Sequence, residues 1–232
     1  ADAAAGAAHR GAGQGGVAVL YAAAIAAAVW CWFQLQWKLE TNFLLACGMA
    51  VPLLGTIHLH WLARPHVWSW VLMLGAIWWA EGERSRVRLA LDAAGTAVWA
   101  NVHGSFWFAP SLALLYGMAR LAGPWIWNLD RRREWEAARY YFVAAGLSAA
   151  ATLVNPYGLA LHRHVIGYLS DSALLASVGE FQSFNFHVDG AGQIVAALAL
   201  AAAGTMLALW RRRLDHFMLG VLLLALALRS AR

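Results

Sequence analysis

The chain has 232 residues, of which 62% are hydrophobic and 12% are charged, with 14 tryptophans and a formal net charge of +5. About a quarter of the residues of an ordinary soluble domain are charged, so this composition excludes that class. The apolar residues also come in long blocks. We therefore expect an all-α fold, a polytopic transmembrane helix bundle that lies in a lipid bilayer.

Long apolar blocks predict eight membrane-spanning helices. A span needs about 20 mostly apolar residues to cross the hydrocarbon core. Blocks that meet or approach this length lie at residues 16–37, 42–62, 66–81, 87–102, 104–122, 138–155, 192–210 and 215–230. The small, glycine-rich residues 1–15 predict a flexible lead-in, so residues 16–232 are expected to form a single transmembrane domain.

The basic residues of the connections are distributed unevenly between the two faces of the predicted bundle. If the spans alternate in direction, only Arg64 and Arg163 reach one face, which we call outer. The other face, expected to be cytoplasmic because such connections are rich in lysine and arginine, receives Lys38, Arg84, Arg86, Arg88, Arg120, Arg131, Arg132, Arg133, Arg139, Arg211, Arg212 and Arg213. Short arginine loops beside anionic head groups explain the positive charge, and no motif indicates a nucleic-acid partner.

The only long connection, residues 156–191, lies on the predicted outer face. A connection of this length is usually functional or contains a short helix of its own. The run from Gly158 to Leu175 is compatible with an amphipathic helix at the membrane interface.

Four polar clusters also fall on the outer face. The first two contain Arg64 with His66 and Asn101 with His103. The planar guanidinium of Arg64 suits a phosphate ligand, although the side chain would equally well extend to a lipid phosphate. His103 is favoured as a catalytic residue because imidazole titrates near neutral pH, whereas Asn101 is first interpreted as a helix cap.

The other two clusters are Asn155–Gly158 and Glu180–Ser183. Pro156 and Gly158 predict the end of a helix followed by a turn. Tyr157 is therefore the residue of this cluster that could donate a hydrogen bond to a ligand. Glu180 is the candidate general base, because it is the carboxylate of a polar and aromatic stretch that also holds Gln182. The alternative is that Glu180 is an ordinary solvated carboxylate.

Metal binding is not indicated by the nine histidines. The closest pairs, His58 with His60 and His162 with His164, are two residues apart. On a helix this spacing separates the side chains by about 200°, so neither pair forms one chelating face. We therefore expect no resident metal site, and the sequence leaves open a divalent cation shared with a phosphate ligand.

Together, these motifs carry a family resemblance. The runs His60–Trp70, Trp99–Gly104, Asn155–Gly158 and Glu180–Ser183, in this order, resemble a bacterial multi-span membrane protein group. That group is itself similar to the GT-C class of glycosyltransferases, which use polyprenyl-phosphate-linked sugars. The resemblance covers roughly residues 16–190 and implies a multi-pass protein of the bacterial inner membrane, with its active site at the outer face.

The resemblance also implies roles for the outer residues. Arg64, His66 and His103 would contact the donor phosphate, with Asn101, Tyr157 and Gln182 around the substrate, and an acidic residue would act as base. The class carries its key acidic residues in a large outer loop after its first span, and Ala1–Gly16 holds no such loop. The expectation is therefore a fragment of a glycosyltransferase that lacks this loop. The alternatives are a non-enzymatic carrier, similar to a transporter, and a membrane scaffold.

Overall fold

A computed structural model describes residues 2–57, 61–188 and 191–229, and within these ranges the chain is all-α. Eight long helices account for most of it, and each overlaps one of the eight predicted apolar blocks, although α1 begins 14 residues before the block at 16–37. The helices are α1 (Asp2–Lys38), α2 (Phe43–Ile57), α3 (His66–Ala80), α4 (Arg86–Ala100), α5 (Phe108–Trp127), α6 (Arg131–Ala151), α9 (Ala191–Trp210) and α10 (Leu214–Arg229). The all-α fold class is confirmed.

Two of these helices are long and apolar enough to cross a membrane by length and composition alone. They are Ala3–Lys38 and Ala191–Trp210, and the shorter α2 and α3 are also apolar. α2 and α3 have 15 residues each, fewer than a perpendicular span needs. The structure therefore shows the eight helices, whereas the crossing of a membrane by all eight is a proposal.

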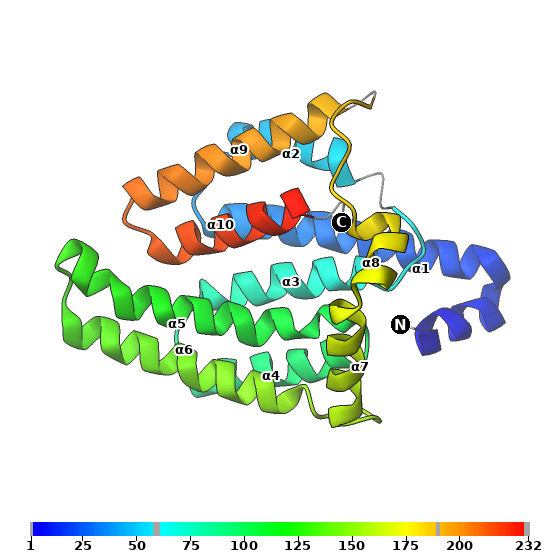
Figure 1. Ribbon diagram of the computed structural model, residues 1–232, viewed down its shortest axis with the longest axis horizontal. Helices are drawn as coiled ribbons and strands as arrows, with labels where there is room; N and C mark the ends of the chain where they lie inside the picture. The colour runs from blue at the N-terminus through cyan, green and yellow to red at the C-terminus, as the bar shows by residue number, and fades with distance from the viewer. Residues whose placement is uncertain (1, 58–60, 189–190, 230–232) are drawn as a thin grey trace.

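The expectation of a flexible lead-in over residues 1–15 differs from what is observed. Helical backbone begins at Asp2 and is interrupted only at Ala12 and Gly13, where Gly13 has a φ of 60°. Alanine has the highest helix propensity, which explains the helical start. A positive φ costs glycine little, and the first turns of α1 fold back at this point (Figure 1).

The long helices lie side by side in an up-and-down arrangement, so that their connections alternate between the two ends of the bundle (Figure 1). One end, which we call the basic end, holds the connections 39–42, 81–85, 128–130 and 211–213. The opposite end, which we call the polar end, holds the connections 61–65, 101–107, 152–158 and 178–188. The arginine-rich connections thus share one end of the molecule, as the alternating pattern predicts.

The core is formed mainly by α3, α4, α5, α6 and α10. Its fully buried side chains include Leu112, Ala113 and Tyr116 of α5 and Ala144 of α6. Small residues let α5 and α6 pack closely, and they form the most extensive pair in the fold. Asp92, the charged residue inside the fourth predicted span, is buried and accepts a hydrogen bond from Ser148 of α6.

The long connection contains two helices, α7 (Leu159–Ser170) and α8 (Ser172–Ser177), followed by the 3₁₀ turn η3 (Gly179–Phe181). The predicted helix of this connection is therefore present, divided in two at Asp171. α7 crosses the polar end of the bundle instead of running along it (Figure 1). His162 anchors it, because its Nε2 lies 2.8 Å from Thr152 Oγ1 and its ring packs edge-on against Phe106.

Candidate functional site

At the polar end, a hydrogen-bond network joins α3 to the connection between α4 and α5. The Trp99 indole Nε1 donates to Ser69 Oγ at 3.2 Å and to Ser105 Oγ at 3.3 Å. Ser105 Oγ lies 3.0 Å from Ser69 Oγ and 2.8 Å from His103 Nδ1, and its single proton can be donated to one of them. The network holds the imidazole of His103, the predicted catalytic residue, against the first turns of α3.

His103 also has a structural role, because it begins the 3₁₀ turn η2 (Gly104–Trp107). Its Nδ1 accepts a hydrogen bond from the Ser105 backbone N–H at 3.2 Å, so the ring caps this turn. Nδ1 therefore carries the lone pair in this arrangement, which leaves Nε2 as the nitrogen that bears the proton in the neutral ring. A ring held in this tautomer presents an N–H donor from Nε2.

Arg64 and His66 precede and begin α3, the helix that carries Ser69. His66 is half-buried and packs edge-on against Trp70, with 5.4 Å between ring centroids. Arg64 is exposed, and its carbonyl accepts from the Val67 N–H at 3.2 Å. Three of the predicted phosphate-binding residues, Arg64, His66 and His103, thus come from segments that meet at the polar end.

Asn101 and Gln182 were predicted to bind substrate, and their amide groups are engaged in holding the backbone. Asn101 Nδ2 donates to the carbonyls of Ala97, at 2.8 Å, and Val154, at 2.7 Å, and so joins the end of α4 to the end of α6. Gln182 Nε2 donates to the carbonyls of Leu175 and Ala176 at the end of α8. The capping interpretation of Asn101 agrees with this geometry.

Tyr157 and Glu180 complete the predicted set. Tyr157 is 72% exposed, and its backbone N–H donates to Asn155 Oδ1 at 2.8 Å in a tight turn, so its ring projects from the polar end. Glu180 lies in η3, and its side chain is outside the described part of the structure. Asp171, in the same connection, accepts from the Leu174 N–H and caps α8.

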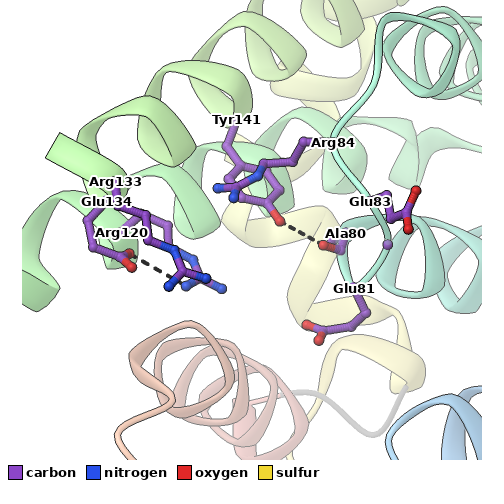
Figure 2. A pocket seen from close by; sticks show the side chains of 9 residues that line it. Ala80, Glu81, Glu83, Arg84, Arg120, Arg133, Glu134 and Tyr141 are labelled. Carbon is purple, nitrogen blue, oxygen red and sulfur yellow. Dashed lines mark hydrogen bonds and ion pairs between the residues drawn. The ribbon is translucent and has the colours of Figure 1, made fainter. Parts of the chain in front are cut away.

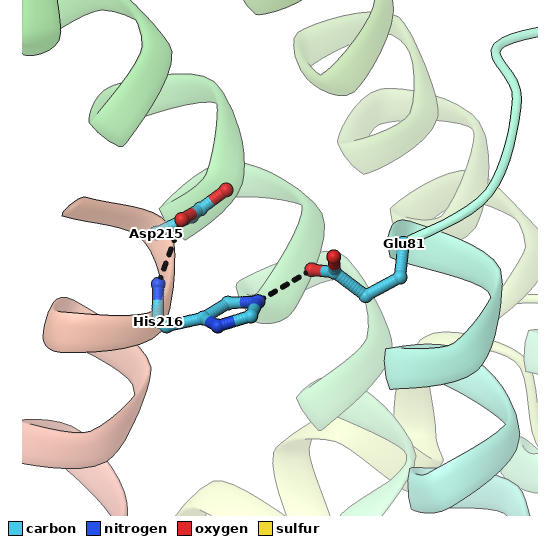
Figure 3. Close-up of side chains that lie close together, drawn as sticks. All are labelled: Glu81, Asp215 and His216. Atoms are coloured by element: carbon cyan, nitrogen blue, oxygen red, sulfur yellow. Dashed lines mark hydrogen bonds and ion pairs between the residues drawn. The ribbon is translucent and has the colours of Figure 1, made fainter. Parts of the chain in front are cut away.

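The basic end holds a second cluster, which the sequence analysis did not identify as a site. Glu81 follows α3, and its carboxylate is the centre of the cluster. Its Oε1 accepts from Tyr116 Oη at 2.7 Å and lies 2.8 Å from His216 Nε2, and its Oε2 accepts from Arg213 at 2.8 Å. Figure 3 shows Glu81 and His216 facing each other from α3 and α10, with Asp215 beside them.

Asp215 extends this cluster to α5 and α6. Its carboxylate pairs with Arg120 at 3.0 Å and with Arg213 at 3.1 Å, and only 4% of its side chain is exposed. Arg120 also pairs with Glu134 of α6 at 3.5 Å. The cluster therefore joins α3, α5, α6 and α10, and we refer to Glu81, Tyr116, Arg120, Glu134, Arg213, Asp215 and His216 as the ionic cluster.

Hydrogen bonds determine the ionisation of this cluster. Burial alone would raise the pKa of Glu81, but the hydrogen bond and charge of His216, with Tyr116 and Arg213, lower it to about 2. Burial opposes the charge of Arg213, yet Asp215 and Glu81 raise its pKa above the usual value. Glu81 and Arg213 are therefore a charged pair at all physiological pH values.

His216 Nε2 lies between a hydrogen-bond donor and a hydrogen-bond acceptor. Its Nε2 lies 2.6 Å from an Arg213 amine and 2.8 Å from Glu81 Oε1. The arginine can only donate and the carboxylate can only accept. A protonated Nε2 therefore bonds to Glu81, and an unprotonated Nε2 bonds to Arg213.

The ionic cluster also has the composition of a metal site. Glu81, Asp215 and His216 each offer a ligand atom, and these atoms lie within 4.8 Å of one another. Arg213 bonds to all three, so its guanidinium already supplies the positive charge that a metal ion would bring. A metal ion would have to displace Arg213, and we assign the cluster a structural role.

A pocket of about 470 Å³ opens beside the ionic cluster (Figure 2). Acidic and basic side chains line it in equal numbers: Glu81, Glu83, Glu134, Arg84, Arg120 and Arg133. Tyr141 closes one side and donates to the Ala80 carbonyl at 2.7 Å. Because the charges are mixed, the pocket favours neither an anion nor a cation.

The two ends therefore differ in what their polar groups can do. At the basic end the carboxylates and arginines form ion pairs with one another, whereas the polar end brings together Arg64, His66 and His103 with the exposed Tyr157. The sequence signal for the ionic cluster is the placement of Glu81 and Asp215 directly at helix ends, but their partners cannot be read from this placement. The chain matches no protein-family model, no curated protein and no solved structure.

Proposed function

We propose that the chain is an integral membrane protein in which all eight long helices cross the bilayer. The supporting observation is the amount of apolar side chain that faces outward from the bundle. Leu44 and Val51 of α2 are 77% and 73% exposed, and among the 20 residues of α9 only Ala191 and Thr205 are buried. Such a surface is unfavourable in water and suits lipid tails. The shorter helices, α2, α3 and α4 with 15 residues each and α10 with 16, cross with local thinning of the bilayer.

We propose that the basic end faces the cytoplasm of a bacterial cell and the polar end faces outward, across the inner membrane. The support is the set of arginine-bearing connections at one end. In a chain with Cys31→Ala and Cys47→Ala, Ser183→Cys should react with an impermeant maleimide in intact spheroplasts. Glu83→Cys should react only after the membrane is opened. The reverse labelling pattern would overturn this orientation, and labelling of both cysteines in sealed cells would overturn the eight-span path.

For the activity, we propose transfer of a sugar from a polyprenyl-phosphate donor at the polar end. The observation that carries this proposal is the network of Trp99, Ser69, Ser105 and His103, because it brings the imidazole to the helix that begins with His66. The donor phosphate would lie against Arg64, His66 and the His103 Nε2–H. Cationic and N–H groups stabilise the negative charge that develops on a phosphate leaving group.

The transfer itself is a substitution at the anomeric carbon. An acceptor hydroxyl oxygen bonds to this carbon, and the bond from the carbon to the phosphate oxygen breaks. The polyprenyl phosphate departs with the electron pair of that bond. The proton of the acceptor hydroxyl passes to a base, for which Glu180 is our candidate. Tyr157, which is exposed at the polar end, is suited to hydrogen-bond the sugar.

The test distinguishes two roles of His103: the cap that it makes on η2 and its proposed contact with the donor phosphate. His103→Asn keeps an acceptor for the Ser105 N–H but removes the imidazole. Membranes that contain His103→Asn or Arg64→Ala should lose sugar transfer to endogenous acceptors, assayed with radiolabelled polyprenyl-phosphate sugars, while the protein remains membrane-integrated. Arg163→Ala, a charge removed from the exposed face of α7, is the matched control and should retain activity. Normal transfer in both site variants would exclude the polar-end site.

A second candidate function is that of a carrier that binds the lipid phosphate without transferring the sugar. The engagement of Asn101 and Gln182 in backbone hydrogen bonds favours it, because fewer side chains remain to orient an acceptor. In this case undecaprenyl phosphate would bind to the purified wild-type protein, and binding would weaken in Arg64→Ala, with no sugar transfer in membranes. A protein with neither binding nor transfer would be a scaffold.

A further inference from the structure

A second pocket, of about 340 Å³, lies on the outer surface of the α5–α6 hairpin at the basic end. Its apolar lining includes Leu121 and Pro124, in the last turns of α5, and two tryptophans, Trp125 and Trp135. Three arginines also line it, Arg120, Arg131 and Arg132, and none of the lining residues is acidic. This composition differs from the mixed charge of the pocket beside the ionic cluster.

The three arginines that line this pocket differ in whether a carboxylate already pairs with them. Arg120 is paired with Glu134 and Asp215, and Arg132 makes a solvent-exposed pair with Glu136 at 3.4 Å. The guanidinium of Arg131 stacks on the Trp125 ring, 4.4 Å from its centroid. No carboxylate among the described residues forms an ion pair with Arg131. Stacking orients a guanidinium and leaves its N–H donors free for an anion.

The position of the pocket indicates which anion it meets. Trp125 is 75% exposed and Trp135 is 51% exposed, and both lie near the turn of the hairpin, at the basic end of the bundle. Indole rings are favoured at the boundary between lipid and water. Leu121 and Pro124 lie within α5, whereas Arg131 and Arg132 lie in the first turn of α6. Apolar residues on the side of the bundle and arginines at its end suit the acyl chain and the phosphate of a phospholipid, respectively. Basic pockets between spans on the cytoplasmic side are typical sites for anionic head groups.

We propose that the α5–α6 hairpin binds one anionic phospholipid at the cytoplasmic face. The phosphodiester contacts Arg131 and Arg132, the glycerol lies between Trp125 and Trp135, and an acyl chain follows Leu121 and Pro124. This site is separate from the polar-end site and rests on the proposed orientation of the basic end. A zwitterionic phospholipid fits the same pocket but has an ammonium group beside the arginines, so it should bind less well.

The experiment measures the phospholipid that remains bound to the purified full-length chain. Protein is equilibrated with mixed micelles of equal amounts of phosphatidylglycerol and phosphatidylcholine, and retained lipids are counted by native mass spectrometry. Wild type should prefer phosphatidylglycerol. The double variant Arg131→Gln and Arg132→Gln should weaken that binding about tenfold or more, since each arginine near an anionic surface adds to the attraction. The control is Arg211→Gln with Arg212→Gln, which removes the same charge from exposed residues of the α9–α10 connection.

The outcomes distinguish a pocket from general attraction. Loss in the α5–α6 variant with retention in the control supports the site. Equal loss in both double variants would mean diffuse surface electrostatics, and no lipid preference in wild type would mean no site. Displacement of the lipid by inorganic phosphate alone would identify a simple anion site and overturn the lipid assignment. The cysteine-labelling and sugar-transfer experiments use other residues, so their failure is separable from failure of this lipid site.

Discussion

The two ends of the bundle hold their polar groups in different ways. At the basic end, the bonds of the ionic cluster connect distant parts of the chain: Glu81 bonds to Arg213 and His216, which are 132 and 135 residues away. At the polar end, many bonds are local, such as those of His103 to Ser105 and of Tyr157 to Asn155, each two residues apart. The ion pairs of the basic end therefore join helices that are distant in the chain. The polar end combines such local turns with longer links, from Asn101 to Val154 and from Ser105 to Ser69. The proposed sugar-transfer site lies at the polar end, whereas the ionic cluster lies at the basic end.

The strongest test of this difference is removal of the charge at the centre of the ionic cluster. Glu81→Gln should destabilise the protein by about 2 kcal/mol, because it leaves the partly buried Arg213 and His216 without a compensating charge. The measurement is thermal unfolding in detergent, followed by circular dichroism. Glu83→Gln, a change in an exposed residue of the same connection, is the control and should unfold like wild type. Equal stability of Glu81→Gln and wild type would contradict a stabilising role for the cluster.

Acid should reproduce much of this loss in the wild-type protein. The pKa of Glu81 is lowered from 4.5 to about 2 in the folded state, so its stabilising contribution is fully present above about pH 4.5. It is lost progressively as the pH falls from about 4.5 through about 2. Unfolding temperatures measured across this range should decline more steeply for wild type than for Glu81→Gln, which has no carboxyl group to protonate. Parallel declines would show that other carboxylates determine the acid response.

At the polar end, the largest structural effect should come from Asn101. Its Nδ2 donates to the carbonyl of Ala97 in α4 and to that of Val154 in the connection after α6, so Asn101→Ala should cost about 1.5 kcal/mol. Asn101→Asp has the same shape but no donor, and it should be no more stable than the alanine variant. Recovery of stability by aspartate would mean that the side chain accepts hydrogen bonds at this position. Thermal unfolding at neutral pH distinguishes the two cases.

His103 should show the smallest effect on stability. Removing its cap in His103→Ala leaves the Ser105 N–H without its acceptor and should cost about 1 kcal/mol. His103→Asn restores the acceptor and should lie within a few tenths of a kcal/mol of wild type. If both variants unfold like wild type but lose sugar transfer, His103 contributes to activity and not to stability, in contrast to the ionic cluster. If His103→Asn is as unstable as Glu81→Gln, the contrast between the ends fails.

Part of the polar-end site could be predicted from its residue types, and part could not. The placement of Arg64, His66 and His103 at one end follows from alternating helices, and the cap made by Asn101 follows from its position at a helix end. The bonds of Gln182 to the end of α8, and the network through Ser69 and Trp99, could not be predicted. Serine and tryptophan have no distinctive spacing, and Ser69 lies 36 residues from Ser105.

The sequence by itself determined the all-α class, the eight long helices and the separation of basic from polar connections. These features depend on apolar block length and charge, which are local properties of the chain. Only the tertiary structure decided that Glu81 pairs with Arg213 and His216, and that α7 crosses the end of the bundle. Many arginines at the basic end are equivalent in sequence, and packing selects the few that lie within reach of a buried carboxylate.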